Sequence, residues 1–129
     1  MATPIDPSAI SLHNTLRRGV APLKLREPGK VSVYWCGPTT YDVAHVGHAR
    51  SAIAFDLLVR VLRAAGLEVH SVRNVTDVDD KILARAKESG EEPTALSARM
   101  AALYQEDMAA LTRGSTVGAS QPSAAMSSW

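Results

Sequence analysis

The sequence predicts an α/β fold built around one parallel βαβ unit. Three observations support this prediction: a β-branched and aromatic run at residues 31–36, an almost wholly apolar run at 51–65, and alternating apolar and polar residues at 67–73. The first and third runs have the length and composition of strands, whereas the second is too long for a strand and is typical of a helix. Because the two strands of such a unit are parallel, Gly37 and Asn74 are expected at the same end of one sheet.

Composition restricts the kind of protein. The chain has 129 residues, a length typical of one domain, and 14 Lys and Arg against 13 Asp and Glu give a net charge of +1. This balance argues against a protein that coats nucleic acid through charge alone. A single cysteine cannot form an internal disulfide, the amino terminus lacks a signal-peptide pattern, and no run reaches the roughly 20 apolar residues of a membrane span. We therefore expect a cytoplasmic protein with no membrane partner.

Three regions can be distinguished along the chain. Residues 1–10, with two prolines among small and polar residues, are expected to form a loose lead-in. Residues 11–111 hold the predicted fold, and within them 11–30 alternate short apolar patches with Gly and Pro, which predicts extended pieces joined by turns. Residues 112–129 are rich in Ser, Ala and Gly without an apolar period, so we expect a disordered tail.

The helix predicted at residues 51–65 has a single polar stripe. Asp56, Arg60 and Arg63 recur at helical spacing, and the remaining positions are mostly apolar. A helix with so narrow a polar stripe is expected to be buried over most of its circumference.

Two further helices are expected after the second strand. Gly90 is a natural stop for a short one, and Pro93 suits the first turn of a longer one that runs to about residue 111. The longer helix should bury one apolar face. The residues of that face are Leu96, Met100, Leu103, Tyr104, Met108 and Leu111.

Two histidines lie where the first strand gives way to the helix. His45 and His48 are one helical turn apart, and Gly47 between them has no side chain to obstruct a ligand or another backbone. Because a helix N-terminus offers unpaired N–H groups, both rings can face a phosphate bound there. The spacing also fits two other interpretations: capping or partly buried histidines without a ligand, and a metal pair completed by Cys36 and Asp42.

The ends of the two strands carry further candidate residues. Cys36 is either a zinc-binding or nucleophilic thiolate or, as a lone cysteine, a small buried hydrophobe. Thr76 and the acidic residues that follow it up to position 80 fit a site for magnesium or a substrate amine, or a capping box with an acidic first turn. Since the ends of adjacent parallel strands lie together, Thr76 and Asp77 are expected beside Cys36 and His45.

Two segments resemble a known family. The strings WCGPTTYDVAHVGHARSAIAFDLLVR and VRNVTDVDDKI resemble the amino-terminal part of cysteinyl-tRNA synthetase, a class I aminoacyl-tRNA synthetase, and residues 45–48 match the first signature of that class. The resemblance extends from about residue 12 to 111. It implies a Rossmann-like nucleotide-binding fold and a ligase that activates L-cysteine with ATP and magnesium and transfers it to tRNA(Cys).

The resemblance also implies roles for individual residues. Cys36 resembles the first ligand of a zinc ion that recognises the substrate thiolate, since sulfur is a far better zinc ligand than a hydroxyl. His45 and His48, with Gly47 between them, resemble the catalytic pair that holds the ATP phosphates. The positions that resemble the amino-acid pocket are Gly37, Thr39, Thr76 and Asp77.

Parts of the family pattern are missing from this sequence. It has no second cysteine to complete the zinc site and no lysine-rich second signature. We therefore expect an incomplete, amino-terminal part of the catalytic domain, with little activity by itself and with a carboxyl-terminal half as a possible partner. Two alternatives stay open: a non-catalytic nucleotide- or metal-binding module or half of a split enzyme, and a cysteine ligase that acts on an amino sugar.

Overall fold

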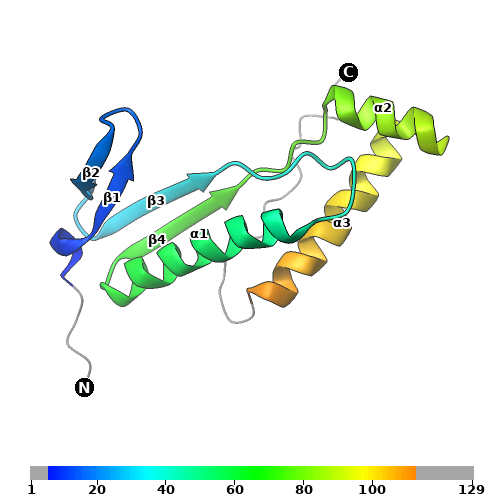
Figure 1. The fold of residues 1–129 in the computed structure, drawn as a ribbon. Helices are drawn as coiled ribbons and strands as arrows, with labels where there is room; N and C mark the ends of the chain where they lie inside the picture. Colours follow the sequence, from blue (N-terminus) through cyan, green and yellow to red (C-terminus); the bar gives the residue numbers. More distant parts are fainter. Residues whose placement is uncertain (1–5, 113–129) are drawn as a thin grey trace.

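A parallel strand pair and one long helix form the centre of the molecule. The computed structural model describes residues 6–112, in which β3 (Lys30–Trp35) and β4 (Glu68–Arg73) pair in register along their whole length. The connecting helix α1 (Val46–Ala64) lies along one face of this pair (Figure 1). The predicted βαβ unit is confirmed, although the helix begins earlier than the apolar run alone suggested.

A small hairpin precedes this unit. The strands β1 (Ser11–Asn14) and β2 (Gly19–Pro22) are antiparallel and form a sheet separate from β3 and β4. This confirms the prediction of extended pieces joined by a turn. Within the expected lead-in, a 3-10 turn (Pro7–Ala9) leads to Ile10, which is buried in the core against α1. The tail predicted at 112–129 lies, apart from its first residue, outside the described residues.

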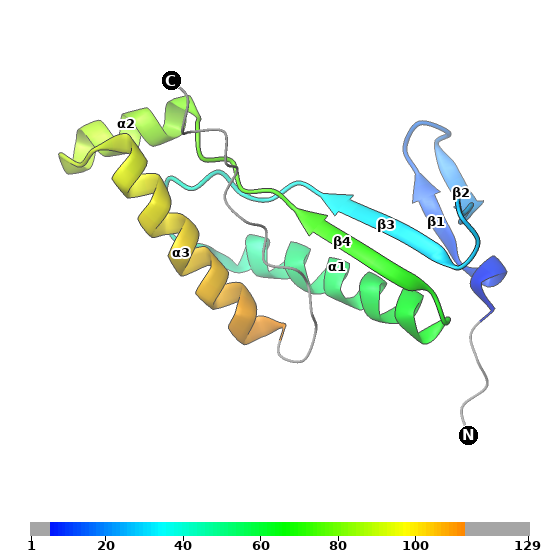
Figure 2. The same cartoon turned by 180° about the vertical axis from the view of Figure 1, so that it is seen from behind.

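Two helices follow β4. The short helix α2 (Asp80–Ser89) ends at Gly90 in the left-handed conformation, and α3 (Pro93–Leu111) packs against α2 and then against the first turns of α1 (Figure 2). The predicted apolar face of α3 is confirmed in its central positions. Leu96, Met100, Tyr104 and Met108 are buried, whereas Leu103 and Leu111 at its border are 38% and 45% exposed. None of the helices within residues 6–112 is both long and apolar enough to cross a membrane.

The expectation that α1 is buried over most of its circumference was wrong. Ile53 and Leu57 are 50% and 61% exposed, whereas Asp56 of the predicted polar stripe is only 9% exposed and bonds Arg60 across 2.7 Å. The helix packs with Leu62 toward the β3–β4 face. Within the described residues, nothing covers its opposite side, so apolar side chains there remain in contact with solvent.

Beyond the ends of β3 and β4, the two backbone segments that follow these strands remain joined by hydrogen bonds. The Asn74 side-chain oxygen accepts the Gly37 N–H at 2.8 Å, the Thr76 N–H donates to the Pro38 oxygen at 3.0 Å, and the Thr40 N–H donates to the Thr76 oxygen at 3.1 Å. We call this set of bonds the loop zipper. It extends the parallel pairing through residues that are not in strands and fixes the carboxyl edge of the sheet.

In the loop zipper, the backbone segments at Gly37 and Asn74 lie very close together. A Cβ atom at this position would lie 1.6 Å from the Asn74 carbonyl oxygen, a distance at which the backbone itself must move. Any side chain here is therefore incompatible with the bond between Gly37 and Asn74.

We predict that Gly37→Ala lowers the free energy of unfolding by about 2 kcal/mol or more, because it forces these backbones apart. Urea unfolding followed by circular dichroism measures the effect. Gly19→Ala is the matched control, since its Cβ would meet only the Arg17 oxygen at 3.9 Å; it should change stability by less than about 1 kcal/mol. Equal midpoints for both variants would contradict the role given to Gly37.

Candidate functional site

The candidate residues gather at the carboxyl end of the β3–β4 pair, where α1 begins. Gly37 and Thr76 belong to the loop zipper, and Thr39 forms an isolated parallel bridge with Thr76. In open α/β sheets this edge is the usual place for a ligand, because loops and a helix N-terminus converge there. The structure thus brings together three of the four residues expected in an amino-acid pocket.

His45 and His48 cap α1 reciprocally. His45 is the N-cap residue, and its Nδ1 accepts the Gly47 N–H at 3.0 Å, while Nδ1 of His48 accepts the His45 N–H at 3.2 Å. The two rings stack with centroids 4.0 Å apart. The capping role expected for this pair is confirmed, and these bonds explain why the helix starts at Val46.

The caps fix the chemistry of both rings. Because each Nδ1 accepts a hydrogen bond, a neutral ring must carry its proton on Nε2. The Nε2–H of His45 and that of His48 are therefore donors that capping does not use. Two donors at the positive end of a 19-residue helix with no acidic residue in its first turn favour an anion.

Gly47 serves the cap itself. A Cβ at this position would lie 2.8 and 2.9 Å from two ring atoms of His45, so only glycine leaves room for that ring to fold back over the helix N-terminus. The sequence interpretation assigned this space to a ligand or a second backbone. In the structure it is the His45 imidazole that uses it.

The surroundings of His48 favour the neutral form of its ring. Partial burial lowers the pKa of His48 from its usual value, and the neighbouring His45 lowers it further. A neutral imidazole keeps Nδ1 free of a proton, and an Nδ1 without a proton is what the cap requires. The electrostatics of the site and the geometry of the cap therefore favour the same protonation state.

The remaining predicted residues lie at the margins of the site. Cys36 is exposed, and its thiol donates a hydrogen bond to the Gly37 carbonyl oxygen at 3.5 Å. Asp77 lines a pocket of about 470 Å³ between α2 and the start of α3. Residues 6–112 hold no group of three or more His, Cys, Asp or Glu side chains that could share a metal ion. The proposed metal pair of His45 and His48 with Cys36 is therefore not formed.

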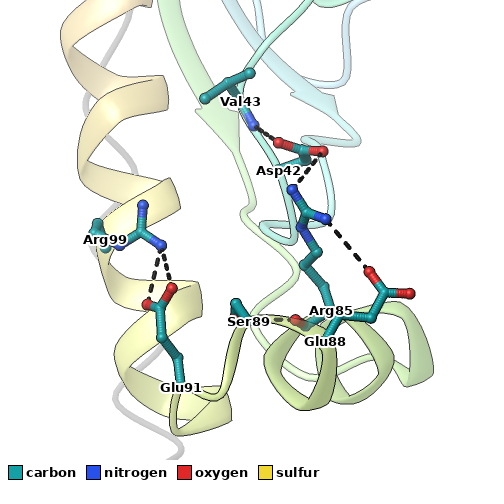
Figure 3. Close-up of polar contacts among 7 residues, drawn as sticks. All are labelled: Asp42, Val43, Arg85, Glu88, Ser89, Glu91 and Arg99. Carbon is teal, nitrogen blue, oxygen red and sulfur yellow. Dashed lines mark hydrogen bonds and ion pairs between the residues drawn. The ribbon is translucent and has the colours of Figure 1, made fainter.

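The loop that leads into His45 is tied to α2. Figure 3 shows Arg85 of α2 between Asp42 and Glu88, with N–O distances of 3.8 Å and 3.3 Å. Asp42 in turn accepts the N–H of Val43 at 2.8 Å. All three charged side chains are substantially exposed, so these pairs guide the loop but contribute little stability.

Four residues that shape the site were not among its predicted members. Asn74 and Thr40 hold the loop zipper, and Thr40 also reaches Ser97 of α3 as a buried hydroxyl pair. Arg73 and Tyr104 stack beside His48. Arg73 and Tyr104 are 31 positions apart in the chain, and Thr40 and Ser97 are 57 positions apart, so no local pattern could reveal these contacts.

Comparison with known proteins gives a consistent result. The family model described as tRNA synthetases class I (C) catalytic domain matches residues 22–125. Proteins named cysteine–tRNA ligase are similar over most of this chain: 55% identity over 106 residues in Anaeromyxobacter sp. (strain K), 53% over 104 in Janthinobacterium sp. (strain Marseille) and 52% over 100 in Marinobacter nauticus. These matches cover 80%, 81% and 78% of this chain but only 21%, 22% and 22% of those relatives.

The lowered pKa of His48 predicts how stability depends on pH. The unfolded chain binds a proton on His48 more readily than the folded chain, so stability is greatest above about pH 6.5 and falls as the pH drops below that value. His48→Gln should reduce this loss, because Gln at the same helix position can still accept the His45 N–H but does not titrate. Urea unfolding at about pH 7.5 and about pH 5.5 measures the difference. An identical loss in both proteins would exclude His48 as its source.

Proposed function

Because the chain belongs to the cysteinyl-tRNA synthetase family of class I catalytic domains, we propose that it forms the phosphate-binding part of a site that activates cysteine with ATP. The complete reaction is the ligation of cysteine to tRNA(Cys), with magnesium accompanying ATP. The observation that supports this proposal best is the reciprocal cap of His45 and His48, which leaves two Nε2–H donors at the N-terminus of α1. The chain spans about a fifth of the length of the relatives it matches.

The proposed chemistry follows from the position of these donors. In the first step the cysteine carboxylate attacks the α-phosphorus of ATP, an aminoacyl adenylate forms and pyrophosphate leaves. Negative charge grows on the phosphate oxygens as the phosphorus is attacked, and preorganised N–H donors stabilise that charge. His45 and His48 supply such donors without reorganising, because their rings are already fixed by the cap. In the second step a tRNA hydroxyl displaces AMP from the adenylate.

We assign the amino acid to the loop zipper beside these histidines. Gly37, Thr39 and Thr76 line the carboxyl edge of β3 and β4, and Asp77 follows directly. Cys36 directly follows β3, and its exposed thiol is accessible to a metal or a ligand. One thiolate does not make a zinc site, so Cys36 as a zinc ligand requires donors from outside residues 6–112. The residues described here therefore do not fit zinc by themselves, and no step of the proposed reaction is derived through it.

The relatives named above favour tRNA as the acceptor over an amino sugar, because all three carry the name cysteine–tRNA ligase. Within this chain, the proposed pocket residues contact cysteine and ATP, which both kinds of ligase use. The acceptor is therefore assigned from the family and not from the geometry of the site.

A variant that keeps the cap but repels phosphate tests the ATP site. His48→Glu retains a side-chain acceptor at the position where Glu completes a capping box, while it replaces an N–H donor by a negative charge. We predict that it raises the dissociation constant of ATP at least about tenfold without unfolding α1. Isothermal titration calorimetry measures the affinity, and circular dichroism the helix.

His13→Glu provides the matched control, because it makes the same change of charge in the exposed β1 strand, away from α1 (Figure 1). It should bind ATP as the wild-type protein does. An equal loss in both variants would show a general charge effect, and wild-type affinity in His48→Glu would remove His48 from the site.

A further inference from the structure

A continuous column of side chains in contact with one another leads to His48 of the histidine pair. Phe55 of α1 packs on Trp35 of β3 with ring centroids 4.2 Å apart, and the guanidinium of Arg73 lies 5.4 Å from the Trp35 ring. The same guanidinium lies 4.8 Å from the ring of Tyr104 on α3, whose ring meets His48 at 82° and 6.3 Å. We call these five residues the aromatic column. It starts and ends on α1 and passes through both strands and α3.

Arg73 is the unusual member of this column. Its Nε atom is buried without a hydrogen-bond partner, and none of the ion pairs found within residues 6–112 includes it. Burial lowers the pKa of the Arg73 guanidinium, with the nearby Tyr104 acting against this shift. Arg73 as a whole is half-buried, and moving a charge partly out of water without a carboxylate partner costs free energy, so an apolar side chain of similar volume is often at least as stable. Packing alone therefore gives no reason for arginine here.

The contact with Tyr104 supplies a reason. Tyr104 is only 7% exposed, and its ring receives the Arg73 cation on its face while it meets the His48 ring edge-on. A cation over a partly desolvated aromatic face is attracted to the ring and restricts its orientation. The His48 ring is thus held on two sides, by Tyr104 and by the bond from the His45 N–H. These contacts together determine where Nε2 points.

We propose that Arg73 is a positioning residue: by fixing Tyr104 it orients the His48 ring and so sets the affinity of the site for ATP phosphates. This inference rests on the proposed function, in which His48 donates to those phosphates. It gives α3 a part in nucleotide binding although Tyr104 is buried beneath the site and does not itself contact the ligand.

Arg73→Met tests this inference, because Met fills similar space without a charge. We expect the dissociation constant of ATP to rise about three- to tenfold while stability stays equal or increases. The ring signals of His48 in a proton–nitrogen NMR spectrum should shift in the absence of ATP. Arg73→Lys, which keeps a cation over Tyr104, should restore part of the affinity. Arg99→Met is the control: Arg99 is on α3, as Tyr104 is, and the substitution removes an ion pair with Glu91 that lies outside the column.

The readouts separate positioning from simple packing. Lower stability of Arg73→Met with unchanged ATP affinity and unchanged His48 signals would overturn the inference. If the wild-type protein itself does not bind ATP, the proposed function fails, and the His48 signals alone decide: a shift in Arg73→Met but not in Arg99→Met supports the positioning role, and the absence of such a shift refutes it.

Discussion

The site depends on the close approach of two backbones just beyond the ends of β3 and β4. A parallel pair of only two strands has few hydrogen bonds to fix its register, and irregular loops normally diverge where such strands end. Here the Asn74 side chain takes the place of a strand partner for Gly37, and the bonds of Thr76 continue the pairing. The absence of a side chain at Gly37 makes this possible. Without the loop zipper, no hydrogen bonds would fix the residues after β3 and the loop that leads to α1 relative to the residues after β4.

The same two side chains serve folding and the proposed chemistry. Both Nδ1 atoms of His45 and His48 are used to cap α1, and only Nε2 remains for a ligand. A serine or aspartate would cap the helix as well but would present no N–H donor. A histidine can accept a backbone N–H at the helix N-terminus through one ring nitrogen and donate to a ligand through the other. This dual use explains why the capping interpretation and the phosphate-binding interpretation are compatible, although they first stood as alternatives.

Local sequence patterns predicted the elements well and their surroundings poorly. The strands, α1 and both carboxyl-terminal helices follow from apolar period, Gly and Pro, because these signals act within a few residues. The burial of Asp56 and the exposure of Leu57 were not predictable, since they depend on which side of α1 meets the sheet. The side-chain contacts of Asn74 and Arg73 were not predicted for a related reason. Their partners lie far away in the chain, and only the parallel crossover brings them together.

The central claim is that the carboxyl edge of β3 and β4 and the first turn of α1 form one preorganised site for ATP. Mapping of backbone amide NMR shifts on addition of ATP with magnesium tests it most directly. The account predicts that the largest changes fall on residues 37–40, 45–48 and 74–76, with little change in the β1–β2 hairpin. Largest changes in the basic segment around Lys24, Arg26 and Lys30, which lines a separate pocket of about 610 Å³, would contradict it.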